Sequence, residues 1–141
     1  MAIELKNLEQ LKSMRKAGLV VADTLKLIKD SAQVGMTTVE LDEIAVDNLK
    51  KHGATPSFLG YHGFPAVICA SVNEEVVHGI PNKRKLISGD LLSIDFGAII
   101  DGWHGDAAIS FGLGEIDAAD QKLMDVCQES MWRGIAAGKA G

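Results

Sequence analysis

Residues 91–113 read LLSIDFGAIIDGWHGDAAISFGL, and this stretch decides the fold. Two short apolar runs, 91–100 and 103–113, flank the dipeptide Asp101-Gly102. Asp-Gly between two such runs is a strong signal for a β-hairpin, because Gly accepts the positive φ that a type I′ turn requires. The sequence therefore predicts two antiparallel strands joined by a two-residue turn.

The turn also predicts which side chains lie together. With a two-residue loop, Ile100 faces Trp103, and counting back along both strands places Gly97 opposite Asp106. Side chains alternate between the two faces of a strand, so Asp95 points to the same face as Gly97 and Asp106. The two carboxylates are then diagonal neighbours with backbones about 7 to 8 Å apart. We expect Gly97 to leave the space between them empty.

The pair Asp95 and Asp106 predicts a cation site. Two ionised carboxylates on a partly buried face repel each other, so either one holds a proton or a cation lies between them. Carboxylate oxygens suit divalent ions such as Mn, Fe(II), Co, Mg or Zn. Two such ions about 3.5 to 4 Å apart, bridged by a carboxylate, are a known means of activating water for peptide hydrolysis. From these residues alone, the alternative is that both are polar residues on an exposed strand face.

Two capping patterns mark helices ahead of the strands. Asn or Thr, followed three residues later by Gln or Glu, predicts helices that start after positions 7 and 37. We expect the first helix to end near Gly35 and the second near Gly53. The apolar stripe of the first helix recurs every three or four residues: Leu11, Met14, Gly18, Val21, Leu25 and Ile28.

The order of the elements predicts the fold class. Between residues 58 and 111, short apolar runs alternate with Gly and Pro, which is typical of strands and hairpins. After Gly114 the chain turns helical again, with Asp117 as its cap. One side of this last helix carries Leu123, Val126, Cys127, Ser130 and Met131. We therefore expect one α+β domain over residues 1–141, with helices covering one face of an antiparallel sheet.

Composition narrows the class of protein. The 141 residues suffice for a single core, and the net charge of -5 without a basic run argues against nucleic acid as a partner. No stretch approaches the roughly 20 apolar residues of a membrane span, and the N-terminus lacks a signal-peptide core. A cytoplasmic location is the resulting expectation. Cys69 and Cys127 match no paired spacing, so we expect both to be reduced and mostly buried.

Four segments together closely resemble the motif series of type I, bacterial-type methionine aminopeptidases. They are GYHGFPAVICAS at 60–71, SVNEEVVHGIP at 71–81, SIDFG at 93–97 and DGWHGD at 101–106. The segments occur in that family's order, with near-matching spacings, over nearly the whole chain. The resemblance implies a metalloaminopeptidase with a pita-bread fold that acts on peptides with an N-terminal methionine.

The resemblance also implies roles for individual residues. Asp95 resembles the bidentate ligand of one metal, and Asp106 resembles the carboxylate that bridges both metals. His78 resembles the catalytic histidine that contacts the scissile amide, although a lone histidine before Gly-Ile-Pro otherwise indicates a turn cap. His104 is expected to pack beside the hairpin. The residues that resemble the substrate-binding set are Tyr61, His62, Phe64, Cys69 and His78.

The pita-bread fold consists of two similar halves with the metals between them. In the family, the second half supplies a histidine and two glutamates as ligands and a second catalytic histidine. No residues follow Gly141 here, so we expect this chain to be the N-terminal half. The complete site holds two ions, Mn, Fe(II), Co or Zn, whereas the chain alone should bind metal weakly or not at all and be inactive. We expect self-association or a complementary C-terminal half as its partner.

Two other functions stay open at this point. One is a non-catalytic pita-bread module that binds peptides or proteins, which the absent second half favours. The retained Asp95, Asp106 and His78 argue against it. The other is a relative of prolidase or creatinase, whose aspartates have similar spacing. The motifs HGIP and GYHGFP favour the methionine-specific branch instead.

Overall fold

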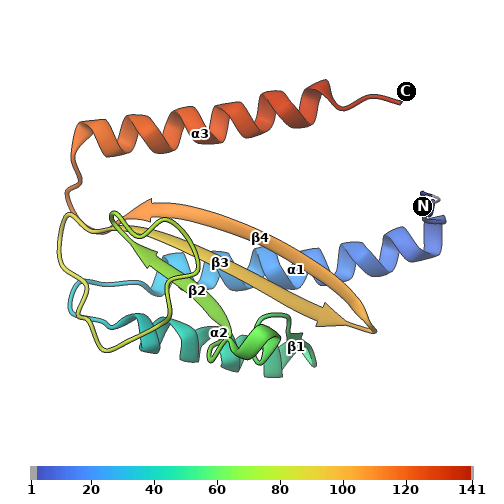
Figure 1. Ribbon diagram of the computed structural model, residues 1–141, viewed down its shortest axis with the longest axis horizontal. Helices are drawn as coiled ribbons and strands as arrows, with labels where there is room; N and C mark the ends of the chain where they lie inside the picture. The colour runs from blue at the N-terminus through green and yellow to red at the C-terminus, as the bar shows by residue number, and fades with distance from the viewer. Residues whose placement is uncertain (1–2, 141) are drawn as a thin grey trace.

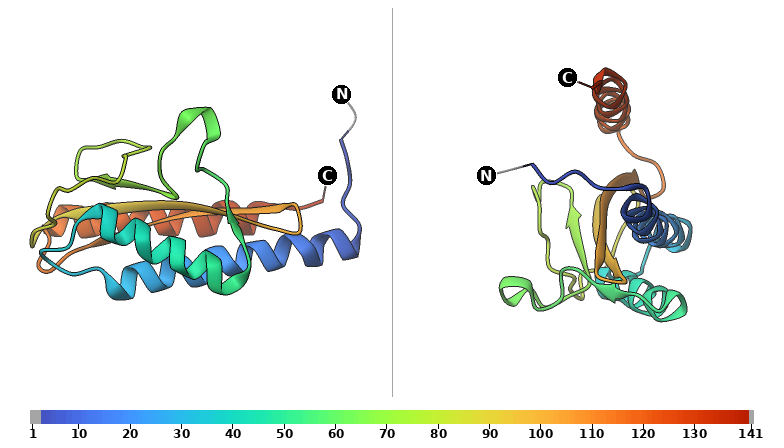
Figure 2. Two further views of the ribbon diagram at one scale, coloured as in Figure 1. Left: turned by 90° about the horizontal axis from the view of Figure 1, so that it is seen from below. Right: turned by 90° about the vertical axis from the view of Figure 1, so that its right-hand side faces the viewer.

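The computed structural model describes residues 3–140, in which three α-helices accompany a four-stranded antiparallel sheet (Figure 1). In chain order the elements are α1 (Leu8–Ser31), α2 (Thr38–His52), β1 (Thr55–Pro56), the 3-10 helix η1 (Tyr61–Gly63), β2 (Ile68–Val72), β3 (Leu91–Ile100), β4 (Trp103–Gly112) and α3 (Ala118–Ala137). Helices α1 and α2 cover one face of the sheet, while the segments around η1 and after β2 lie over the other (Figure 2). The predicted α+β class, with helices on one face, is confirmed.

The β3–β4 hairpin has the register that its turn predicts. Gly97 lies opposite Asp106, and Asp95 lies opposite Ala108. Both turn residues have positive φ, 51° at Asp101 and 79° at Gly102, as a type I′ turn requires. On its other edge, β3 pairs with β2 through its first half and with β1 near its end.

The core lies between the sheet and the two covering helices. Alternate side chains of β3 point toward the helices and are fully buried: Leu92, Ile94, Phe96 and Ala98. The side chains between them, including Asp95, therefore point to the opposite face. That alternation separates the apolar core from the face that carries the carboxylates.

Both predicted capping boxes form, at Asn7 and at Thr37. However, α1 ends at Ser31 rather than near Gly35. Beyond the helix the chain turns to pair with the segment before β3, and the Gly35 N–H donates to the Leu86 carbonyl at 2.8 Å. A tertiary backbone contact thus ends the helix earlier than its glycine predicts.

The apolar stripe of α1 is only partly core. Val21, Leu25 and Ile28 are buried as predicted, but Leu11 and Met14 are 47% and 38% exposed. The first turns of α1 extend past the tip of the hairpin, where no strand lies beneath them (Figure 1). The amphipathic pattern therefore continues beyond the surface that it packs against.

Helix α3 stands apart from the sheet and buries none of its side chains (Figure 2). The predicted apolar side is present, but Leu123, Val126 and Met131 are more than half exposed. Cys127 is exposed too, so the expectation of two mostly buried cysteines is wrong for it and holds for Cys69. Across residues 3–140, no helix has both the length and the apolar character needed to cross a bilayer.

Gly105 allows α1 to approach β4 closely. A side-chain carbon at this position would lie 2.6 Å from the carbonyl carbon of Ala17 and 2.7 Å from the nitrogen of Gly18. Both are backbone atoms of a helix, which cannot rotate out of the way. The glycine in the DGWHGD motif is therefore required by helix packing on the face opposite Asp106.

Gly105→Ala is expected to lower the free energy of unfolding by about 2 to 3 kcal/mol, because the added methyl forces α1 away from the sheet. Urea unfolding followed by circular dichroism measures the change. Gly18→Ala is the matched control, since a side-chain carbon there meets nothing within 4 Å and alanine favours helix. It should hold or raise stability. Equal urea midpoints for Gly105→Ala and the unmodified chain would contradict the close approach.

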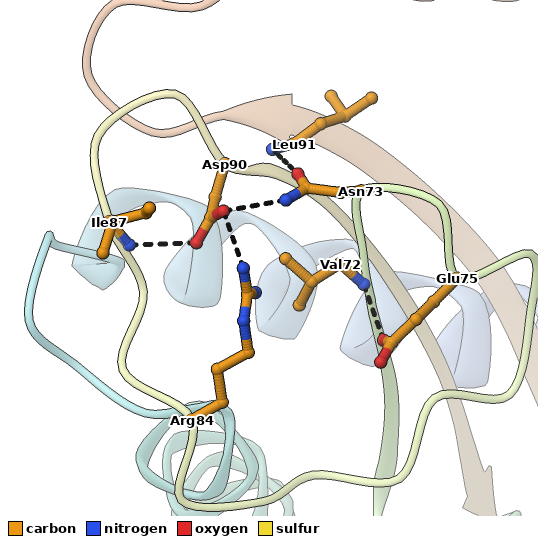
Figure 3. A network of polar contacts seen from close by, with 7 residues as sticks. All are labelled: Val72, Asn73, Glu75, Arg84, Ile87, Asp90 and Leu91. Atoms are coloured by element: carbon orange, nitrogen blue, oxygen red, sulfur yellow. Dashed lines mark hydrogen bonds and ion pairs between the residues drawn. The ribbon is translucent and has the colours of Figure 1, made fainter.

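A polar network around the buried Asp90 ties the loop before β3 to the end of β2 (Figure 3). Asp90 keeps only 2% of its side chain exposed. It accepts hydrogen bonds of 2.9 Å from the Arg84 guanidinium, the Asn73 amide and the Ile87 N–H. Burial by itself raises the pKa of Asp90, but these donors and the charge of Arg84 hold it below its ordinary value. Asp90 is therefore ionised and fully paired at neutral pH.

Asp90→Asn is expected to lower the free energy of unfolding by roughly 2 kcal/mol at neutral pH, because an amide gives up charge-assisted hydrogen bonds. A carboxylate with a depressed folded-state pKa stabilises the fold above its unfolded pKa, and this contribution is lost as pH falls through the folded pKa. Urea midpoints of variant and parent should therefore converge as the pH is lowered below about 4. A gap that persists undiminished as the pH falls well below about 4 excludes the charge as its cause.

Candidate metal and substrate site

A cavity of about 560 Å³ opens on the sheet face opposite the covering helices. It is lined by Phe58, Tyr61, His62, Gly63, Phe64, Pro65, Cys69, His78, Ile80, Asp95 and Asp106. Every residue that the motifs nominate for metal or substrate is in this set. The structure therefore brings them together from a 3-10 helix, three strands and a loop, while their individual roles stay predictions.

Asp95 and Asp106 both line the cavity, Asp95 half-buried and Asp106 exposed. The Oδ1 atom of Asp95 is buried and has no hydrogen-bond partner. Burial raises the pKa of the Asp95 carboxyl, and the nearby charge of Asp106 raises it further, against smaller opposing effects of His78 and the Phe96 N–H. An ionised carboxylate without a partner is unfavourable in such a place. A divalent cation would supply the missing partner, so the donor set fits a metal.

The expected role of Gly97 is wrong. A side-chain carbon there would lie 2.7 Å from Cβ of Ser57 and 3.0 Å from Cε1 of Phe58. The Ser57 N–H also donates to the Gly97 carbonyl at 3.0 Å. The room beside Gly97 is thus filled by the segment that follows β1, and does not stay empty between the carboxylates.

His78 reaches the cavity because Gly79 lets its loop lie directly on β2. A side-chain carbon at Gly79 would be 2.4 Å from the carbonyl oxygen of Ala70. The Ala70 N–H donates to the Gly79 carbonyl at 2.9 Å, and the Gly79 N–H donates to Ser71 Oγ at 3.1 Å. His78 itself has a φ of 58°, a conformation that non-glycine residues rarely adopt outside tight or functional turns. Backbone contacts with β2 therefore hold the loop that carries His78 at the cavity.

The apolar wall is built from residues near η1 and from β2. His62 has a φ of 47°, and its ring meets that of Tyr61 edge to face at 4.4 Å between centroids. Phe64 is half-buried, and Cys69 is buried. Burial raises the pKa of Cys69 to about 11, with Asp95 and Asp106 adding to the effect. Its thiol is therefore neutral at pH 7 and suits an apolar pocket.

Four lining residues were not predicted as site residues from the sequence: Phe58, Gly63, Pro65 and Ile80. The two with large apolar side chains are Phe58 and Ile80. Phe58 lies two residues before the segment that starts at Gly60, and Ile80 lies within HGIP. Apolar residues that flank or interrupt such motifs were the available signal. His104 does not line the cavity, but hydrogen-bonds Ser57 beside the hairpin.

The chain offers only part of a metal coordination shell. Within residues 3–140, no group of three or more His, Cys, Asp or Glu side chains is placed to hold an ion. Divalent ions in oxygen-rich sites take up to six ligands. Asp95 and Asp106 therefore fit as two ligands of a larger set.

Comparison with known proteins identifies the relatives of this arrangement. The sequence pattern of metallopeptidase family M24 matches residues 12–141. Methionine aminopeptidase 1 of Mycobacterium tuberculosis is 53% identical over 133 residues, which are 94% of this chain and 50% of that protein. Methionine aminopeptidase of Clostridium acetobutylicum is 46% identical over 140 residues, 99% of this chain and 56% of that protein. The chain thus spans about half the length of the curated relatives it matches.

Solved structures show the same likeness. The crystal structure of methionine aminopeptidase from Thermotoga maritima superposes with a TM-score of 0.96 at 35% identity, covering 99% of this chain and 57% of that chain. The predicted fold, half of a pita-bread arrangement, is confirmed.

Proposed function

The chain belongs to metallopeptidase family M24, and from that premise we propose that it supplies the N-terminal part of a methionine aminopeptidase active site. The observation that carries the proposal is the buried, unpartnered Oδ1 of Asp95 in a cavity shared with Asp106 and an apolar wall. A divalent cation is the chemical partner that such carboxylates favour, and a flexible thioether is a side chain that such a wall accommodates. Together they favour metal-dependent removal of an N-terminal methionine.

The residue roles form part of the proposal. Asp95 and Asp106 hold divalent ions, which when bound polarise the peptide carbonyl and activate water. The substrate-binding residues are Tyr61, His62, Phe64, Cys69 and His78. The neutral Cys69 thiol and the ring of Phe64 bind the methionine side chain. His78 donates a hydrogen bond to the scissile amide and orients it.

A complementary C-terminal half completes this proposed site. Residues 1–141 act as one N-terminal domain of the catalytic unit, and the complement supplies the remaining ligands of two ions, Mn, Fe(II), Co or Zn. The exposed apolar side chains of α3 favour such a partner, or self-association in its absence. Alone, the chain binds metal weakly and is inactive. A cytoplasmic location, where nascent chains carry their initiator methionine, belongs to the same proposal.

Reconstitution tests the function. The chain is assayed on a Met-Gly-Met peptide with Mn²⁺ or Co²⁺, with and without a separately produced second half of the Mycobacterium tuberculosis relative. Turnover only in the mixture, absent with chelator and with a Lys-Gly-Met peptide, is the expected result. No turnover in either preparation, together with saturable binding of the peptide, would favour a non-catalytic peptide-binding module.

A further inference from the structure

Ser57 and His104 join two segments that are far apart in the chain. Ser57 Oγ and His104 Nδ1 lie 3.0 Å apart, at hydrogen-bond distance. Ser57 directly follows β1, and the next residue, Phe58, lines the cavity. His104 precedes Asp106 by two positions on β4, so both side chains point to the same face of the sheet. The bond therefore links the start of the cavity wall to the strand that carries Asp106.

The position of Ser57 depends on Gly97. Because Gly97 has no side chain, Ser57 lies directly over β3, with its Oγ 3.0 Å from where a side-chain carbon of residue 97 would stand. Its N–H is already bound to the Gly97 carbonyl. Ser57 thus contacts β3 through its backbone and β4 through its hydroxyl. These two contacts hold Ser57 at the position where the cavity wall leaves the sheet.

Beyond Ser57, the chain from Phe58 to Ala66 forms an arch-shaped segment of the cavity wall, called the arch below. Its backbone hydrogen bonds are mainly between its own residues. The Gly60 N–H donates to the Phe64 carbonyl at 2.8 Å, and the Tyr61 N–H donates to the Phe58 carbonyl at 2.9 Å. At the far end, the Val67 N–H donates to Asp42 at 2.8 Å. Tyr61, in the middle, is 67% exposed. The two ends of the arch therefore determine where its apolar side chains lie in the cavity that they share with Asp95 and Asp106.

We propose that Ser57 and His104 are positioning residues that hold this wall at a fixed height above Asp95 and Asp106, and thereby set the affinity for the methionine side chain. The inference rests on the proposed function. Neither residue lines the cavity, so each acts through the wall. Loss of either residue weakens binding of the substrate and of the transition state to the same extent, which raises KM and leaves kcat nearly unchanged.

Kinetics of the reconstituted site test the positioning role. Ser57→Ala and His104→Ala are each expected to raise KM for the methionyl peptide about fivefold to tenfold with kcat within about twofold. The double variant should be no worse than either single variant, because all three lose one shared contact. His104→Asn keeps a polar atom near the place of Nδ1 and should restore most of the affinity. Ser110→Ala, the control, breaks a 2.8 Å hydrogen bond to Ser93 on the same strands away from the cavity and should leave KM unchanged.

Amide hydrogen exchange of the chain alone tests the attachment without turnover. Ser57→Ala and His104→Ala should speed exchange across residues 57–64 by up to about tenfold, and Ser110→Ala should not. Unchanged exchange in this segment, unchanged KM, or a loss confined to kcat overturns the inference. If the unmodified reconstituted site turns over no peptide, the proposed function fails, and exchange alone still decides whether Ser57 and His104 hold the wall.

Discussion

Asp95→Asn is expected to reduce metal-dependent turnover of the reconstituted site by more than about a hundredfold. Mutation of a residue that only hydrogen-bonds to a metal ligand costs up to about a hundredfold, and Asp95 is proposed to be a ligand itself. The same substitution should stabilise the metal-free chain by roughly 1 kcal/mol. Both effects have one cause. The Asp95 Oδ1 is buried without a partner, so its charge is unfavourable in the absence of a cation and useful in its presence.

The pH dependence has a definite sign. Burial and the charge of Asp106 raise the folded-state pKa of Asp95 above its ordinary value. A carboxyl with a raised folded-state pKa contributes stability that is fully present below its unfolded pKa, about 3.9, and is lost as pH rises through the folded pKa. The stability advantage of Asp95→Asn should therefore be largest at neutral pH and should vanish in acid.

Thermal unfolding in chelator and turnover with Mn²⁺ measure the two effects. Asp101→Asn is the matched control, because it makes the same chemical change in the same hairpin, at a turn where asparagine accepts the positive φ. It should change neither quantity appreciably. An Asp95→Asn protein that keeps its metal-dependent turnover, or that melts below the parent in chelator at pH 7, would contradict the proposed role of this carboxylate.

Local rules were enough to predict the hairpin and its carboxylates. The Asp101-Gly102 turn sets the register, and strand alternation then places Asp95 and Asp106 on one face. These inferences need no knowledge of distant segments. The capping boxes succeeded for the same reason, since their donors and acceptors lie within three residues of each other.

Contacts between distant segments could not be predicted in this way. Gly97 was expected to leave open space, but Ser57 fills it from a segment about forty residues away in the chain. Leu11 continues the apolar stripe of α1 but is 47% exposed, and Val126 lies on a helix with no buried side chain. Periodicity indicates that a face is apolar, but it does not identify what covers that face. Ile80 lines the cavity but was not predicted from the sequence, because its position depends on the path of the loop that follows β2.

That loop path depends on Gly79. A methyl group at this position would stand 2.4 Å from the carbonyl oxygen of Ala70 and 2.9 Å from Cα of Ser71, both backbone atoms of β2. The loop must therefore lift away, which breaks the 2.9 Å hydrogen bond from the Ala70 N–H to the Gly79 carbonyl. His78 precedes Gly79 directly and must move with it. One substitution should thus damage both the strand contact and the site.

Gly79→Ala is expected to lower turnover of the reconstituted site about a hundredfold, because a catalytic group displaced by about 1 Å loses that much. It should also lower the free energy of unfolding by about 2 kcal/mol through overpacking. His78→Asn separates the two effects. Asparagine tolerates the φ of 58° at this position, so stability should hold while turnover falls about a hundredfold or more. If Gly79→Ala loses stability but keeps turnover, His78 does not need this loop position, and its proposed contact with the scissile amide is wrong.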